Sequence, residues 1–166
     1  HDGVSGRTDD PNLLRVPKQN PLHREEHHRK QLKSKTIVAV IGCGLIGNKR
    51  ARSAREHPET DLRFVVDADK TRAVQCAKKY GGLWETDWRK AVRDPGVDLV
   101  VVSTPNHLHR GIACESLRNG KHVLVEKPMG RNLKETEQIF LCAVRSKRKV
   151  KAGFSLRYHP AIQKAH

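Results

Sequence analysis

The chain has 166 residues, of which 36% are hydrophobic and 31% charged, and its formal net charge is +15. This composition is typical of one soluble domain, with room for an additional unstructured segment. No apolar run reaches the roughly 18 residues that a membrane-spanning helix needs, and no signal peptide opens the sequence. The positive charge favours anionic partners, such as phosphorylated ligands, nucleic acid or membrane headgroups.

The first 35 residues differ from the rest in composition. They are polar, contain three prolines and have no helical or strand periodicity. We expect residues 1–35 to be a mobile leader. They hold eight basic and five acidic residues, so most of the net charge, +12, lies on residues 36–166.

Histidine and cysteine residues show no metal-ligand spacing. His23, His27 and His28 lie in a charged stretch that we interpret as a solvated helix face, not as a metal site. The cysteines are far apart and include no Cys-x-x-Cys pair. We therefore expect free thiols, as in a reducing compartment, and a cytoplasmic protein. We expect no bound metal. The four cysteines are Cys43, Cys76, Cys114 and Cys142.

From Thr36 onward, short β-branched runs alternate with helical patterns. The run from Val97 to Val102 is almost entirely apolar, as in strands buried on both faces of a parallel sheet. The alternation predicts an α/β fold: a doubly wound parallel sheet of the Rossmann type, with about six strands and helices on both faces. The expected strands are 36–41, 61–66, one near Leu83, 97–103, 121–125 and 149–154, and the expected helices are 45–57, 70–80, 86–93, 107–119, 132–146 and one from about 159.

A glycine-rich turn follows the first expected strand and precedes a helix. Gly42 would permit the tight turn, Gly44 would let the backbone approach a pyrophosphate, and Gly47 would let the helix pack on the strand. The free N–H groups at the start of that helix would attract phosphates. A glycine-rich turn in an α/β domain without a ligand is the alternative interpretation.

An acidic residue ends the second expected strand. Asp67 lies 20 residues after Gly47, close to the spacing of about 20 that places a carboxylate on the adenosine ribose. Such a carboxylate repels a 2′-phosphate and so favours NAD. Lys70 and Arg72 lie nearby and could receive that phosphate, so NADP stays open.

Two further motifs follow later strands. "STPNHLH" (103–109) follows the strand expected beside the first, where Pro105 would stiffen the turn and Asn106 could cap the next helix. "EKP" (126–128) places Lys127 at a strand end, as a candidate acid–base or substrate-orienting group. Taken alone, the first motif is better explained as a well-built helix start, and on spacing alone a surface lysine explains the second motif equally well.

These motifs, with "GCGLIG", "VVDAD" and "GFSLRYHPAIQKA", resemble the N-terminal half of the glucose-fructose oxidoreductase, inositol dehydrogenase and MocA (Gfo/Idh/MocA) family. The resemblance covers about residues 36–166. It implies an NAD(P)-dependent oxidoreductase that transfers hydride between nicotinamide and a sugar, a cyclitol or a related hydroxy compound.

The resemblance also implies roles for individual residues. Lys127 would be catalytic, close to the reacting substrate carbon and to the cofactor. The remaining cofactor-binding residues would be Gly42, Cys43, Gly44, Leu45, Ile46 and Gly47 on the pyrophosphate and adenosine side, Asp67 on the ribose, Thr104, Pro105, Asn106 and His109 along the nicotinamide half, Glu126 on the nicotinamide ribose, and Arg157 near the nicotinamide end.

Members of this family are usually about twice as long and carry a second, substrate-binding domain. We therefore expect a Rossmann domain over 36–158 and the start of a junction helix over 159–166, with the second domain missing. Lys127 then lacks an identifiable catalytic partner. The chain alone is expected to bind dinucleotide with little turnover, and a homo-oligomer would need the missing domain.

Two other functions compete with this interpretation. One is a non-catalytic nucleotide-binding or scaffold protein that retains the fold. The other is a nucleic-acid binder, suggested by the net charge and by the basic run "RSKRKVK" (145–151). Nucleic acid is the weaker alternative because no recognition motif is visible and only 4% of the residues are aromatic.

Overall fold

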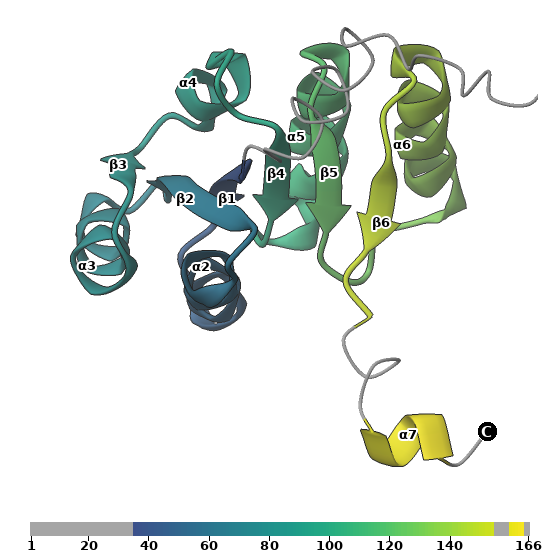
Figure 1. Cartoon of the computed structure of the whole chain (residues 1–166). Helices are drawn as coiled ribbons and strands as arrows, with labels where there is room; N and C mark the ends of the chain where they lie inside the picture. The colour runs from purple at the N-terminus through teal and green to yellow at the C-terminus, as the bar shows by residue number, and fades with distance from the viewer. Residues whose placement is uncertain (1–34, 155–159, 165–166) are drawn as a thin grey trace, which may run out of the picture. The chain divides into compact units, whose positions relative to one another are not determined.

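The computed structural model describes residues 35–154 and 160–164. Six strands form one sheet in the order β3-β2-β1-β4-β5-β6, and each neighbouring pair is parallel (Figure 1). The strands are β1 (Thr36–Ile41), β2 (Thr60–Val66), β3 (Leu83–Glu85), β4 (Leu99–Val102), β5 (His122–Val125) and β6 (Val150–Ala152). The helices are α2 (Leu45–Glu56), α3 (Lys70–Tyr80), α4 (Trp88–Arg93), the 3-10 turn η1 (Asn106–Leu108), α5 (His109–Arg118), α6 (Leu133–Ser146) and α7 (Pro160–Lys164).

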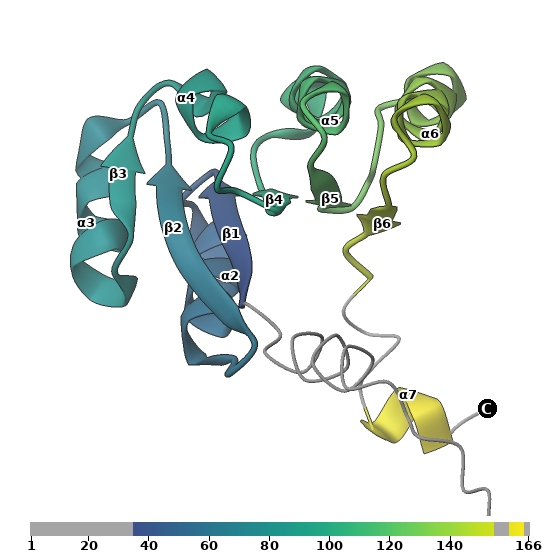
Figure 2. The same ribbon diagram turned by 45° about the horizontal axis from the view of Figure 1, so that its top comes forward.

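The sheet is wound in two directions from its centre. The chain runs from β1 outward to β2 and β3, then returns to β4 on the other side of β1 and continues to β5 and β6. Helices α2 and α3 cover one face, and α4, α5 and α6 cover the other (Figure 2). The predicted doubly wound Rossmann architecture is therefore confirmed. Its direction reverses between β1 and β4, where such folds bind ligands beyond the carboxyl ends of the strands.

Strand β1 shows why the central strands are apolar on both faces. Val38 and Val40 pack into the core beneath α2 and α3, which includes Ala51. Ala39 and Ile41 belong to the core beneath α4, α5 and α6. Successive side chains of a strand point to opposite faces, so a strand covered on both sides must be apolar at every position.

The observed boundaries differ from the expected ones at several helix starts and at the ends of β4 and β6. Helix α4 begins two residues later than expected, because the Asp87 side chain accepts a hydrogen bond from the backbone N–H of Arg89 and caps the helix. The expectation that Asn106 caps the following helix is wrong. Asn106 instead opens the 3-10 turn η1, and α5 begins at His109 without a side-chain cap.

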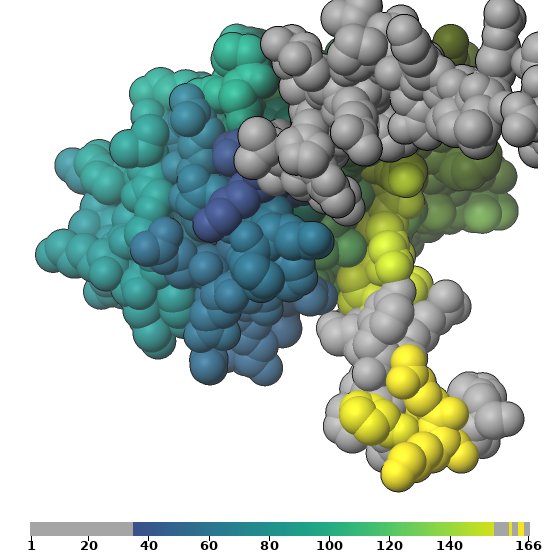
Figure 3. Space-filling model, viewed as in Figure 1, coloured from purple at the N-terminus to yellow at the C-terminus, as the bar shows by residue number. Residues whose placement is uncertain are grey.

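Side chains of the sheet region pack closely on the face that the space-filling view shows. In the space-filling view, the chain from β1 to α4 forms one unbroken surface, so side chains fill the spaces between the ribbons (Figure 3). None of the described helices combines the length and the apolar character that crossing a membrane requires.

Candidate functional site

A cleft of about 540 Å³ lies where the sheet reverses direction, at the carboxyl ends of β1, β2 and β4. Its walls come from the glycine turn after β1, the residues after β2 and the loop after β4. Seven predicted site residues line it: Gly42, Gly44, Leu45, Ile46, Asp67, Thr104 and Pro105. The fold thus brings together motifs that are up to about sixty residues apart in the sequence.

The three glycines of the turn meet different spatial demands. Gly42 has φ +97°, and a Cβ there would lie 2.6 Å from the carbonyl of Ser103. A Cβ on Gly47 would lie 1.7 Å from the carbonyl oxygen of Gly42, so α2 can pack this closely only with glycine at that position. A Cβ on Gly44 would meet nothing within 4 Å. The protein itself therefore does not require Gly44, and its bare backbone borders the open cleft.

The start of α2 adds backbone donors to this wall. Gly44 is the N-cap residue and supplies no side-chain cap to the first turn. Leu45 and Ile46 follow it and are exposed in the cleft. The first N–H groups of a helix have no intrahelical acceptor and carry a partial positive charge. Backbone of this kind is suited to an anionic group such as a phosphate.

Asp67 is held at the rim by the backbone. Its Oδ2 accepts a hydrogen bond from the N–H of Cys43 at 2.8 Å, and its Oδ1 accepts one from the N–H of Asp69 at 2.9 Å. A carboxylate has about four lone-pair sites, so each oxygen can accept a further hydrogen bond. The side chain is therefore oriented by the glycine turn and still able to accept from a ligand hydroxyl.

The loop after β4 contributes polar atoms that have no partner among the described residues. The hydroxyl oxygens of Ser103 and Thr104 are buried and make no hydrogen bond within the part of the chain that the structure describes. Both residues line the cleft. Because an unpaired buried hydroxyl costs free energy, these two atoms fit a site that a polar ligand completes.

His109 does not line the cleft. Its side chain is buried, with Nε2 at 2.8 Å from the carbonyl oxygen of Thr104 and Nδ1 at 3.0 Å from that of Pro128. The imidazole thus connects the loop after β4 to the loop after β5. From the protein interior, the His109 side chain holds the backbone carbonyl of Thr104 in place. The motif spacing did not predict this positioning role.

Glu126 is also buried and lies outside the cleft lining. Its Oε1 accepts from Nε of Arg50 at 2.6 Å and lies 2.5 Å from Nη2 of the same guanidinium. Gly153 packs against this carboxylate, since a Cβ there would lie 2.8 Å from Oε2. The adjacent Lys127 is exposed and makes no side-chain hydrogen bond or ion pair with the described residues.

The other predicted site residues have different positions. Cys43 and Gly47 belong to the turn but do not line the cleft, and neither does Asn106. Arg157 lies outside the described residues. The cleft also contains residues that no motif indicated, such as Trp88 at the start of α4 and Thr86 before it. Their only sequence signal is their position after β3, whose register against β2 brings them to the same end of the sheet.

The cysteines form two contacting pairs in space. Hydrogen bonding to Cys76, together with burial, raises the pKa of the Cys43 thiol. Burial and the neighbouring Cys142 raise the pKa of Cys114 to about 12. All four are free thiols.

Within 35–154 and 160–164, no three His, Cys, Asp or Glu side chains converge on a possible metal position. His23, His27 and His28, which we interpreted as a solvated helix face and not as a metal site, lie outside these ranges.

A doubly wound sheet with a glycine turn, an acidic residue after β2 and an open cleft at the switch point defines the class of dinucleotide-binding α/β proteins. The family model described as "oxidoreductase family, NAD-binding Rossmann fold" matches residues 36–154, and the chain belongs to this Gfo/Idh/MocA family. The family resemblance noted from the motifs is therefore confirmed.

Individual relatives agree with this assignment. The chain is 34% identical to levoglucosan dehydrogenase of Pseudarthrobacter phenanthrenivorans, over 75% of this chain and 34% of that protein. It is 32% identical to scyllo-inositol 2-dehydrogenase (NAD(+)) of Bacillus subtilis, over 76% of this chain and 38% of that protein. The chain thus spans little more than a third of the length of these relatives.

Solved structures give the same result. GenD2 from gentamicin A biosynthesis, in complex with NAD, superposes with a TM-score of 0.78 at 32% identity, over 80% of this chain and 38% of that one. The 3-ketoreductase KijD10 from Actinomadura kijaniata, in complex with NADP, has a TM-score of 0.75 at 28% identity, over 80% of this chain and 42% of that one. Both forms of the cofactor therefore occur among the structural neighbours.

Proposed function

We propose that this chain is the dinucleotide-binding part of an NAD(P)-dependent oxidoreductase that acts on a sugar, a cyclitol or a related hydroxy compound. The observation that carries the proposal is the cleft at the switch point. There the bare backbone of Gly44 borders the same space as Ser103 and Thr104, whose buried hydroxyls have no hydrogen-bond partner among the described residues. These features are what a polar, phosphate-bearing ligand would complete.

The chain's own residues suggest how such a ligand would be held. The backbone N–H groups of Leu45 and Ile46, next to Gly44, would bind the pyrophosphate. Asp67, already oriented by Cys43, would accept hydrogen bonds from the adenosine ribose. Thr104 and Pro105 would lie along the nicotinamide half, with Asn106 and Arg157 nearby. When bound, the nicotinamide supplies the hydride acceptor or donor.

Proton transfer is the task we assign to Lys127. Its exposed side chain follows β5 at the end of the sheet where the cleft lies, and Glu126 beside it would face the nicotinamide ribose. General acid–base catalysis requires that this amine be held within hydrogen-bond reach of the substrate hydroxyl. No described residue orients it, so we propose that the 166-residue chain binds dinucleotide but turns over substrate poorly.

The cofactor preference depends on charges near Asp67. We propose NAD as the preferred form, because the Asp67 carboxylate would repel a 2′-phosphate. Arg72 is the group that opposes this preference, since it lines the cleft and its Nε lies 3.5 Å from Asp69. Lys70 is turned to the Trp84 ring, with Nζ 5.3 Å from the centroid, and does not line the cleft.

Calorimetric titration of the chain with NADH and with NADPH tests the proposal. Saturable binding, tighter for NADH, is expected. Asp67→Asn should weaken NADH binding by about tenfold, the usual effect of losing hydrogen bonds to a charged group. Asp61→Asn is the matched control, because Asp61 is an exposed residue of β2, the strand that precedes Asp67. Absence of binding of either dinucleotide to the folded chain would contradict the proposal.

The location and organisation of the protein complete the proposal. The four free thiols support a cytoplasmic protein, and cell fractionation with an antibody to the chain would test this. We also propose residues 36–158 as the dinucleotide domain, preceded by a leader at 1–35 and followed by a junction helix at 159–166. Limited proteolysis should then leave a core that begins near residue 36.

A further inference from the structure

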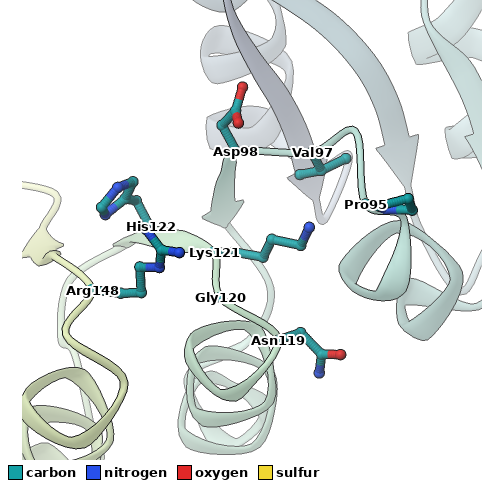
Figure 4. A pocket seen from close by; sticks show the side chains of 8 residues that line it. All are labelled: Pro95, Val97, Asp98, Asn119, Gly120, Lys121, His122 and Arg148. Atoms are coloured by element: carbon teal, nitrogen blue, oxygen red, sulfur yellow. The ribbon is translucent and has the colours of Figure 1, made fainter.

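A second pocket, of about 370 Å³, lies at the amino ends of β4, β5 and β6, the end of the sheet opposite the cleft (Figure 4). Its walls come from the α4–β4 loop, the α5–β5 turn and the α6–β6 turn. The residues that line it are Pro95, Val97, Asp98, Asn119, Gly120, Lys121, His122 and Arg148. Three of these eight are basic and one is acidic, so the pocket is suited to an anion.

His122 presents a hydrogen-bond donor at this pocket. Its Nδ1 accepts a hydrogen bond from the backbone N–H of Lys149 at 3.0 Å. An imidazole nitrogen that accepts carries no proton, so the ring proton lies on Nε2. Nε2 has no partner among the described residues. The backbone of Lys149, just before β6, thus fixes the imidazole and leaves its Nε2–H donor available to a ligand.

Lys121 is a cation that folding has placed inside the protein. Only 6% of the residue is exposed, and Nζ donates to the backbone carbonyl oxygen of Asp94 at 2.7 Å. An ammonium group has three donors, so two are left for other partners. Burial lowers the pKa of this amine, against the attraction of Asp94 and Asp98. A bound anion would offset that desolvation cost.

Arg148 contributes a guanidinium group that no carboxylate of the described residues pairs with. It extends from the α6–β6 turn towards His122 (Figure 4). Gly120, at φ +76°, leaves room for it, since a Cβ there would lie 3.6 Å from Nη2 of Arg148. The planar guanidinium can donate two parallel hydrogen bonds to a phosphate.

Asp98 is the acidic residue of the lining, and the backbone partly satisfies it. Its Oδ2 accepts a hydrogen bond from the N–H of Ile37 at 2.8 Å. Its other oxygen can accept from a ligand hydroxyl. Pro95 and Val97 add an apolar wall beside it. The pocket therefore combines the Arg148 and His122 donors on one side with a hydroxyl acceptor and carbon surface on the other (Figure 4).

We propose that this pocket binds a small hydroxylated organic phosphate, with its phosphate group held by Arg148 and His122 and with the buried Lys121 ammonium adding positive charge to the pocket. A phosphate of a nucleic-acid backbone has the same charge, but the donors line a small concavity instead of a continuous stripe. The binding site is separate from the dinucleotide cleft and does not depend on what that cleft binds.

Amide NMR spectra of the whole 166-residue chain test this proposal, because they distinguish the two sites. Ribose 5-phosphate should shift the amide signals of Gly120, Lys121 and His122 saturably, and unphosphorylated ribose should not. Arg148→Ala should weaken this binding by about tenfold, because charge-assisted hydrogen bonds are lost. The matched control is Arg145→Ala, an exposed cation on α6 that does not line the pocket.

The other outcomes overturn the proposal. If ribose 5-phosphate shifts only the amide signals of the glycine turn, it binds in the cleft alone. Equal weakening by Arg148→Ala and Arg145→Ala would show diffuse charge attraction instead of a site. A short single-stranded oligonucleotide that binds more tightly than ribose 5-phosphate, with equal dependence on both arginines, would point to a nucleic-acid surface.

Discussion

Arg50 on α2 and Glu126, the residue after β5, form an ion pair with Nη2 and Oε1 2.5 Å apart. The Arg50 side chain is 24% exposed and that of Glu126 is 11% exposed, so solvent screens the pair only partly. The contact joins the helix of the glycine turn to the "EKP" segment. It therefore links the two halves of the proposed cofactor site through protein atoms alone.

Arg50→Ala should lower the free energy of unfolding by about 2 kcal/mol, because it leaves the Glu126 carboxylate buried without this partner. Arg52→Ala, on the same helix, removes an exposed pair with Glu56 and should cost less than about 0.5 kcal/mol. Urea unfolding followed by circular dichroism measures both. Equal losses in the two variants would show that the buried pair adds nothing specific.

Gly47 and Gly44 should respond oppositely to alanine. Gly47→Ala forces a Cβ against the carbonyl of Gly42 and should destabilise the chain by about 2 kcal/mol or more. Gly44→Ala has open space and should leave the unfolding free energy nearly unchanged while it weakens NADH binding at least about tenfold. Thermal unfolding and calorimetry separate the two effects. Undiminished NADH binding by Gly44→Ala would remove that residue from the proposed site.

Glu135 should contribute to the loss of folding stability at acidic pH. Hydrogen bonds from the side chain and backbone of Arg131 lower its pKa to about 2, from an ordinary value of 4.5. A carboxyl group with a depressed folded-state pKa stabilises the fold above its unfolded pKa, and this contribution disappears as the pH falls from about 4.5 towards 2. Glu135→Gln should therefore lower stability at neutral pH and flatten its decline over this range.

The control for Glu135 is Glu137→Gln, an exposed change on the same helix. Urea unfolding between pH 7 and pH 3 provides the comparison. Glu137→Gln should keep the slope of the parent chain. Identical pH profiles for the parent and Glu135→Gln would mean that the Arg131 contact does not persist in solution.

Thiol modification should be selective. Cys142 is partly exposed, whereas Cys43, Cys76 and Cys114 are buried. The pKa of Cys114, raised to about 12, also keeps this thiol protonated at pH 8, and the thiolate is the reactive form. A maleimide should label Cys142 first and the other three only on unfolding, as mass spectrometry can follow. Rapid labelling of Cys43 in the folded chain would contradict this burial.

The sequence alone was sufficient to predict the order of the helices and strands and the position of the glycine turn. Strand β1 and helix α3 have the expected bounds, because hydrophobic periodicity and caps such as Asp69 are local properties. The ends of β4 and β6 were overestimated. Apolar residues such as Val97 continue into a loop where they pack on the core without pairing as strands, and periodicity does not distinguish these cases.

The roles of Gly42 and Gly47 follow from the spacing of the motif, since the backbone conformation and the packing of one helix on its own strand are short-range demands. Tertiary structure decided the contacts between distant segments. Arg50 meets Glu126 across 76 residues, His109 turns inward to two backbone carbonyls, and the Lys121 amine reaches the backbone carbonyl oxygen of Asp94. Such meetings depend on strand order and on which side chain reaches which cavity, and neither is encoded within one local stretch of sequence.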